Sequence, residues 1–75
     1  MTDLESQIVK SLVGLHRSTA TNQGAIANIY GLIAKTPAFS EDDENAEYCK
    51  NIAEMTRKHA REHQEISEKL KELLE

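Results

Sequence analysis

The second half of this 75-residue chain carries a regular stripe of hydrophobic and weakly polar positions. The stripe recurs at alternating spacings of three and four residues and contains Cys49, Ile52, Thr56, His59, His63, Ile66, Leu70 and Leu73. Such heptad spacing predicts an amphipathic helix whose stripe packs against another helix. Small or apolar residues flank the stripe on one side, at Ala53, Ala60, Ser67 and Leu74. The remaining surface is charged, so we expect it to face solvent.

The first half repeats the same spacing, so the whole chain is expected to be all-α. Its stripe contains Ile8, Leu12, Leu15, Thr19, Asn22, Ile26, Ile29 and Ile33. The segment STATNQG, residues 18–24, is the weakest part because Thr, Asn and Gly lower helix propensity. The stripe keeps its phase through this segment, which favours one continuous helix. A break near Gly24, giving three helices, is the alternative.

One break divides the chain almost in half, at the segment AKTPAFS, residues 34–40. Pro37 cannot continue a helix and pushes the preceding residue towards an extended backbone. We therefore predict a single domain, residues 1–75, with a helix over about 3–35, a turn at 36–40 and a helix over about 41–74. Ser40, with Asp43 in a capping box, is the expected N-cap of the second helix, and Asp3 that of the first.

Two helices of matched length predict an antiparallel helical hairpin. A turn centred near residues 37 and 38 makes the numbers of facing residues sum to about 75, which pairs Thr19 with Thr56, His16 with His59 and Leu12 with His63. Polar residues then gather at one level between two apolar ends. A hairpin of this size has too little apolar surface to bury on its own, so we expect two copies to dimerise into a four-helix bundle through these stripes.

Composition and charge narrow the functional classes. Nine basic residues against thirteen acidic residues give a net charge of −4, so general attraction to nucleic acid or to an anionic membrane is not expected. The longest apolar stretch, residues 25–34, is about half of the ~20 residues that span a bilayer. The single cysteine, Cys49, cannot form an internal disulfide, and no basic segment precedes an apolar one at the N-terminus. A small buried thiol in a cytoplasmic protein is the expectation.

The segment HAREH, residues 59–63, is the sharpest candidate for chemistry. It resembles the H-x-x-E-H motif of inverted zinc metalloproteases, in which two helical histidines bind Zn²⁺ and the glutamate activates water. The resemblance covers these five residues only. Those proteases also need a third metal ligand and a substrate cleft, which a short helical chain does not offer, so we predict that the protein is not an enzyme. A metal site without catalysis is the alternative, with His59 and His63 on one helix and His16 on the other. The preferred hypothesis is structural: neutral core histidines bonded to Thr19, Asn22 or each other, without a cofactor.

Partner-binding candidates lie on the charged surface. Arg57, Lys58 and Arg61, with Arg17 at the same level on the first helix, form a local basic belt. The preferred interpretation is a solvated surface paired with neighbouring glutamates. RNA is the alternative, since the architecture is similar to that of Rop-type RNA-binding hairpin dimers, a likeness of fold without an aligned motif.

Aromatic residues gather near the turn, at Tyr30, Phe39 and Tyr48, where we expect them to close one end of the bundle. With the features above, they predict a small non-enzymatic interaction module, adaptor or regulator. It is expected to form a homodimer and to bind another protein. Nucleic acid and membranes are not expected partners.

Overall fold

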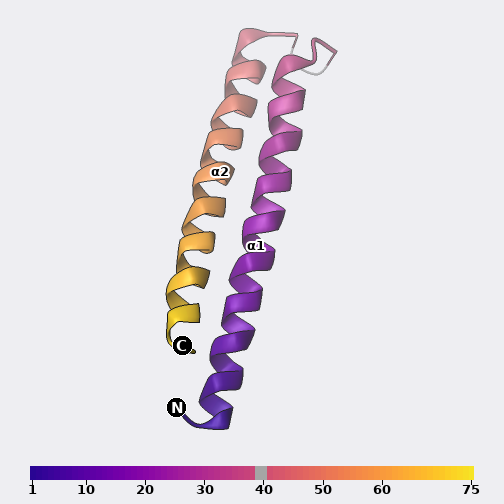
Figure 1. Ribbon diagram of the computed structural model, residues 1–75. Helices are drawn as coiled ribbons and strands as arrows, with labels where there is room; N and C mark the ends of the chain where they lie inside the picture. The colour runs from indigo at the N-terminus through magenta and orange to yellow at the C-terminus, as the bar shows by residue number, and fades with distance from the viewer. Residues whose placement is uncertain (39–40) are drawn as a thin grey trace.

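The computed structural model describes residues 1–38 and 41–75, and it contains two long helices. Helix α1 spans Asp3–Lys35 and helix α2 spans Asp43–Glu72. The helices run antiparallel and pack side by side along a rod of 56 × 14 × 13 Å (Figure 1). The predicted all-α helical hairpin is confirmed.

Helix α1 is continuous through Gly24, so the alternative with three helices is wrong. The polar residues of this segment do not interrupt the helix because their hydroxyls bond within it. Thr19 Oγ1 donates to the carbonyl of Leu15 at 2.9 Å, and Thr21 Oγ1 donates to the carbonyl of Arg17 at 3.1 Å. Each hydroxyl reaches the carbonyl one turn back and leaves the main-chain hydrogen bonds in place.

A capping box begins α1, one residue earlier than predicted. Thr2 Oγ1 accepts a hydrogen bond from the Glu5 N–H at 3.1 Å, and Glu5 Oε1 accepts one from the Thr2 N–H at 2.8 Å. Thr2, not Asp3, is therefore the N-cap. Asp3 is the first helical residue, where its negative charge meets the positive end of the helix dipole.

Asp42 caps α2 in place of the predicted Ser40, which lies outside the described residues. Asp42 Oδ1 accepts a hydrogen bond from the Asn45 N–H at 2.7 Å. A carboxylate satisfies the free N–H groups of the first turn as well as a hydroxyl does, and it adds a favourable charge. Asp43, predicted within the capping box, is instead the first residue of α2.

Small residues make up half of the contact between the two helices. This hairpin seam contains Val9, Val13, His16, Ala20, Gln23, Ala27, Tyr30 and Ala34 from the first half, and Cys49, Ala53, Thr56, Ala60, His63, Ser67, Leu70 and Leu74 from the second. All of them are buried or half-buried, and Ala27 and Ser67 have no exposed surface. Small side chains at a contact allow two helix axes to approach closely.

The hairpin seam is not the predicted stripe. On α1 every seam residue follows a predicted residue by one position, as Ala27 follows Ile26. On α2 half of the predicted positions hold, whereas Ile66 gives way to Ser67. Most large apolar residues of the predicted stripe on α1 therefore lie beside the contact between the two helices and not within it. Both stripes have the same period, and the smaller residues permit the closer packing.

The register of the hairpin also differs from the prediction by about one helical turn. His16 contacts His63, and their numbers sum to 79 instead of 75. Thus His16 does not lie beside His59, and Leu12 does not lie beside His63.

Candidate interaction surfaces

The hairpin seam divides the rod into two sides with different chemistry. Successive helical residues are rotated by about 100°, so the residue before each seam position and the residue after it lie on opposite sides of the seam. In an antiparallel pair, the preceding residues of both helices fall on the same side. Side chains of one kind therefore continue from α1 across to α2.

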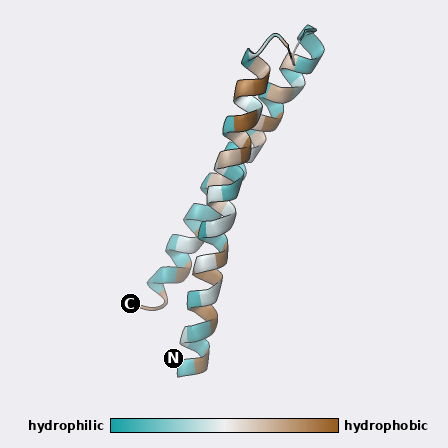
Figure 2. Cartoon of the chain, turned by 90° about the vertical axis from the view of Figure 1, so that its right-hand side faces the viewer, coloured by the Kyte–Doolittle hydropathy of each residue, from teal (hydrophilic) through white to brown (hydrophobic). Residues whose placement is uncertain are grey.

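The residues that precede the seam positions form an open apolar face. On α1 they are Ile8, Leu12, Leu15, Thr19, Asn22, Ile26, Ile29 and Ile33, and on the second half Tyr48, Ile52, Met55, His59, Glu62, Ile66, Lys69 and Leu73. Several large hydrophobic residues are more than half exposed, including Leu15 at 64% and Ile29 at 57%. Figure 2 shows the strongest hydrophobic colour in the half of the hairpin nearest the connection. This face contains all of the stripe predicted on α1.

The middle of the apolar face is polar. Thr19 and Asn22 on α1 stand at the level of His59 and Glu62 on α2, given the register that joins His16 to His63. Of the residues predicted to gather at one level, His16, Thr56 and His63 lie in the seam instead. The predicted polar level exists, but it is divided between the seam and the apolar face.

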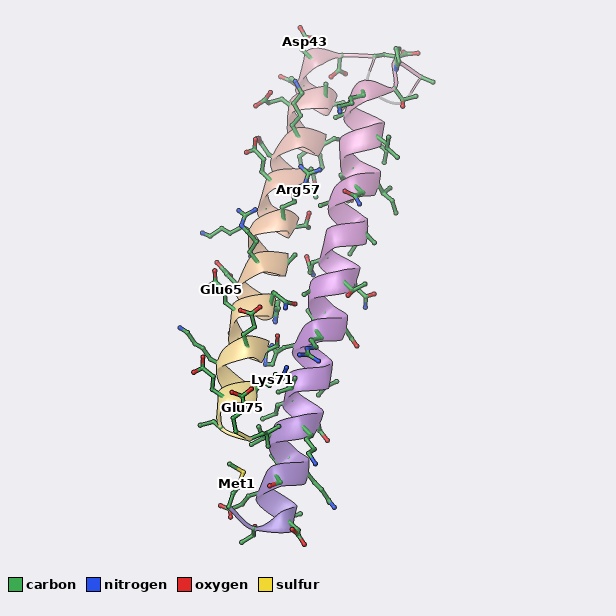
Figure 3. The ribbon with its side chains drawn as sticks, in the orientation of Figure 1. Met1, Asp43, Arg57, Glu65, Lys71 and Glu75 are labelled. Carbon is green, nitrogen blue, oxygen red and sulfur yellow. The ribbon has the colours of Figure 1, made fainter. Side chains whose placement is uncertain are left out.

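The residues that follow the seam positions form a basic face on the other side. They are Lys10, Gly14, Arg17, Thr21, Gly24, Asn28, Gly31 and Lys35 on α1, and Lys50, Glu54, Arg57, Arg61, Gln64, Glu68, Lys71 and Glu75 on the second half. Seven basic residues face three acidic ones here, although the whole chain has a net charge of −4. The side chains of Arg57 and Lys71 lie on the side of α2 that borders α1 (Figure 3).

The predicted basic belt is only partly one surface. Arg17, Arg57 and Arg61 lie on the basic face, whereas Lys58 lies off it. Within the described ranges the single ion pair joins Lys58 to Glu62, with Nζ 4.0 Å from Oε1. Pairing with glutamates, predicted for the whole belt, thus applies to Lys58 alone. Sequence reasoning missed Lys10, Lys35, Lys50 and Lys71, although the same heptad spacing connects them.

His16 and His63 meet in the seam. Their Nδ1 atoms are 2.8 Å apart, and the rings stack with centroids separated by 5.0 Å and planes inclined by 29°. One ring must donate its N–H and the other must accept, an arrangement that depends on the tautomers. The predicted bonds of His63 to Thr19 or Asn22 are wrong, and His59 is exposed on the apolar face. Nowhere in residues 1–38 and 41–75 do three or more His, Cys, Asp or Glu side chains converge on a metal position.

The buried hydroxyls of the seam bond within their own helix. Thr56 Oγ1 donates to the carbonyl of Ile52 at 2.9 Å, and Ser67 Oγ donates to the carbonyl of Gln64 at 2.7 Å. Because of these bonds, every buried polar side-chain atom among the described residues has a partner. The His16–His63 bond is the one side-chain hydrogen bond that joins α1 to α2 within the described part of the chain.

Cys49 is buried as a free thiol, as predicted. The aromatic residues do not form the single cluster that we predicted near the turn. Tyr30 is half-buried in the seam, Tyr48 is exposed on the apolar face, and Phe39 lies outside the described residues.

Neither helix, over its described residues, has an apolar stretch long enough to cross a membrane. Comparison with protein-family models, with curated proteins and with solved structures finds no match to this chain. The two faces of the hairpin are therefore the basis for any functional assignment.

Proposed function

We propose that this chain is a non-enzymatic interaction module that works as a homodimer, in which two hairpins bury their apolar faces in a four-helix bundle. The observation that carries the proposal is the distribution of side-chain size. Small residues hold α1 to α2, whereas large ones such as Leu15 and Ile29 stand exposed on one face. A contiguous apolar surface rimmed by charge is typical of a protein interface.

The exposed area of the hairpin supports this proposal. The hairpin exposes 5646 Å². A folded monomer of 8.4 kDa exposes about 4,600 Å² by the usual scaling of area with mass. The excess, on the order of 1,000 Å², is comparable to the ~800 Å² that each partner buries in a standard protein interface. A second copy supplies a surface of the same size and pattern.

The polar middle of the apolar face gives the bundle a means to fix its alignment. Asn22 and His59 interrupt a face that is apolar towards both ends. A buried polar layer favours one register of two helical surfaces, because a shifted register leaves polar groups against apolar ones. The layer therefore favours one defined dimer over a mixture of sliding pairs.

Within the cell, the module would act by presenting its remaining surface to another macromolecule, as an adaptor or regulator. The buried, unpaired thiol of Cys49 supports a reducing compartment, and we propose the cytoplasm.

Sedimentation equilibrium over a concentration series tests the dimer. The wild-type chain is expected to sediment as a dimer, and the double variant Leu15→Lys with Ile29→Lys as a monomer or an unfolded chain. The matched control, Thr21→Lys with Asn28→Lys, adds the same charge to exposed positions on the basic face and is expected to stay dimeric. A fully helical wild-type monomer throughout the series would overturn the proposal.

A further inference from the structure

Two hollows lie along the basic face, where α1 and α2 meet. The hollow near the chain ends is lined by Lys10, Arg17 and Lys71 around Val13, Gly14 and Leu74. The hollow nearer the turn is lined by Lys35, Lys50, Arg57 and Glu54 around Gly31, Ala34 and Ala53. Each hollow thus has small or apolar residues at its base and at least three cations around it. No cation of this face has an ion-pair partner among the described residues.

Cations on both helices stand one heptad apart. Lys10 and Arg17 are seven residues apart on α1, and so are Lys50 and Arg57 on α2, while Lys71 continues the same row. Seven helical residues rise about 10.5 Å, so one pair of cations stands at this spacing on each rim of the groove. Charges at heptad spacing beside a helix contact are the positions at which helices select partners of opposite charge.

The glycines of the chain all lie on this face, yet the hairpin itself does not need them. A Cβ built at Gly14 or Gly24 meets nothing within 4 Å, and one at Gly31 lies 3.6 Å from Arg57 Nη2, an ordinary contact. Glycine in a helix weakens it, and its use is to allow another backbone to approach closely. The groove is therefore open for a third helix.

Nucleic acid fits this face less well. A nucleic-acid strand presents a phosphate about every 3.4 Å, whereas the cations of this face are widely spaced and leave most phosphates without a partner. Glu54 and Glu68 interrupt the basic face, and the net charge of −4 repels a polyanion at longer range. An α-helix with acidic residues on its flanks and small residues between them matches both the separated cations and the glycines of the groove.

We infer that the basic face docks an acidic α-helix of a partner protein in the groove between α1 and α2. Glu or Asp side chains on both flanks of that helix pair with the two rows of cations, and its small residues lie over the glycines. This inference deepens the proposed function and rests on it by naming the class of partner. In the proposed dimer the groove remains accessible, because the apolar face lies on the opposite side of the seam.

Fluorescence anisotropy tests the inference with a labelled synthetic helix of four heptads that carries Glu on both flanks of an alanine stripe. The control peptide has Lys in place of each Glu. We expect the Glu peptide to bind and the Lys peptide not to bind. Arg17→Gln with Arg57→Gln is expected to weaken binding about tenfold, since rim charges act mainly by complementarity. Lys58→Gln removes a cation that lies off both faces and is expected to leave binding within about twofold.

A second variant separates docking from folding. Gly14→Ala with Gly31→Ala is expected to raise the melting temperature of the hairpin and yet to weaken binding of the Glu peptide, because two methyl groups now fill the groove. Any one of four results overturns the inference: no binding of the Glu peptide, equal losses from the arginine substitutions and from Lys58→Gln, unchanged affinity in the alanine variant, or tighter binding of an RNA or DNA oligonucleotide than of the peptide.

Sedimentation of the same samples keeps this inference distinguishable from the proposed dimer. A dimer that does not bind the Glu peptide refutes the docking inference alone. A monomer that binds it refutes the four-helix bundle alone.

Discussion

The Nδ1 atoms of His16 and His63 lie 2.8 Å apart across the seam of the hairpin. Such an approach requires that one nitrogen carries the proton and the other offers its lone pair. The pair therefore joins α1 to α2 in a way that depends on protonation. When both rings are protonated, neither nitrogen can accept, and two positive charges stand at contact distance.

Loss of this hydrogen bond is expected to weaken the hairpin. His63→Ala removes the ring that meets His16 and leaves a half-buried imidazole nitrogen without this partner. The melting temperature, followed by circular dichroism, should therefore fall in this variant.

The control for this variant is Glu65→Ala, which changes an exposed residue of α2 outside the seam and is expected to leave the melting temperature nearly unchanged. A melting temperature of His63→Ala equal to that of the wild type would contradict the role of the pair.

The capping box at the start of α1 predicts a local response to acid. The hydrogen bonds from Thr2 lower the pKa of the Glu5 carboxyl below its ordinary value. Since the pKa is lower in the folded state, the stabilisation is present above the unfolded value near 4.5 and is lost as the pH falls through the folded one. The protection of the first-turn amides of α1 against hydrogen exchange should therefore decrease in this pH range.

Thr2→Ala provides the test of that cap. It removes the hydroxyl that accepts from the Glu5 N–H and is expected to move the pKa of Glu5 up, measured by NMR titration. Glu65→Gln, on the exposed surface of α2, serves as the control and should leave the first turn unchanged. An unmoved Glu5 titration in Thr2→Ala would refute the capping box.

The sequence was sufficient to predict the helices, because heptad spacing and Pro37 define two arms and one break. It did not predict which stripe lies between them. Ile26 and Ala27 belong to adjacent stripes of identical period, and size alone favours the isoleucine as a core residue. Ala27 lies in the seam instead, because a hairpin with small residues at its contact packs closely and leaves its large side chains on one face.

The candidate sites were predicted only in part for the same reason. Because the seam of α1 lies one residue beyond the predicted stripe, His16 enters it, and the register shift of about one helical turn places His16 beside His63 in place of His59. The cations of the basic face lie far apart in the sequence, as Lys10 and Lys71 do, and only the register of the hairpin brings them to one hollow. The register of the hairpin depends on the connection between the two helices. A shift by one helical turn still pairs one stripe with the other, so the heptad pattern alone does not define the register.

Gly24→Ala is expected to stabilise the hairpin by about 1 kcal/mol, the difference in helix propensity between the two residues. Nothing lies within 4 Å of the added methyl group, so packing does not oppose the gain. Urea denaturation at a fixed protein concentration measures the change. Ala25→Gly, at the neighbouring exposed position, is the reverse control and should destabilise by a similar amount. A loss of stability in Gly24→Ala would show that this position is more crowded than the hairpin indicates.

Ala27→Leu is expected to destabilise the hairpin, because the seam has no room for a larger side chain. Ala27 has no exposed surface, and overpacking of such a site costs about 1–3 kcal/mol. Ala25→Leu introduces the same side chain two positions away, where the residue is exposed, and is expected to be nearly neutral. Urea denaturation of both variants at one protein concentration decides the point. If Leu at position 27 were tolerated as well as at position 25, the large apolar residues would lie between α1 and α2 after all, and the proposed dimer would lose its exposed apolar face.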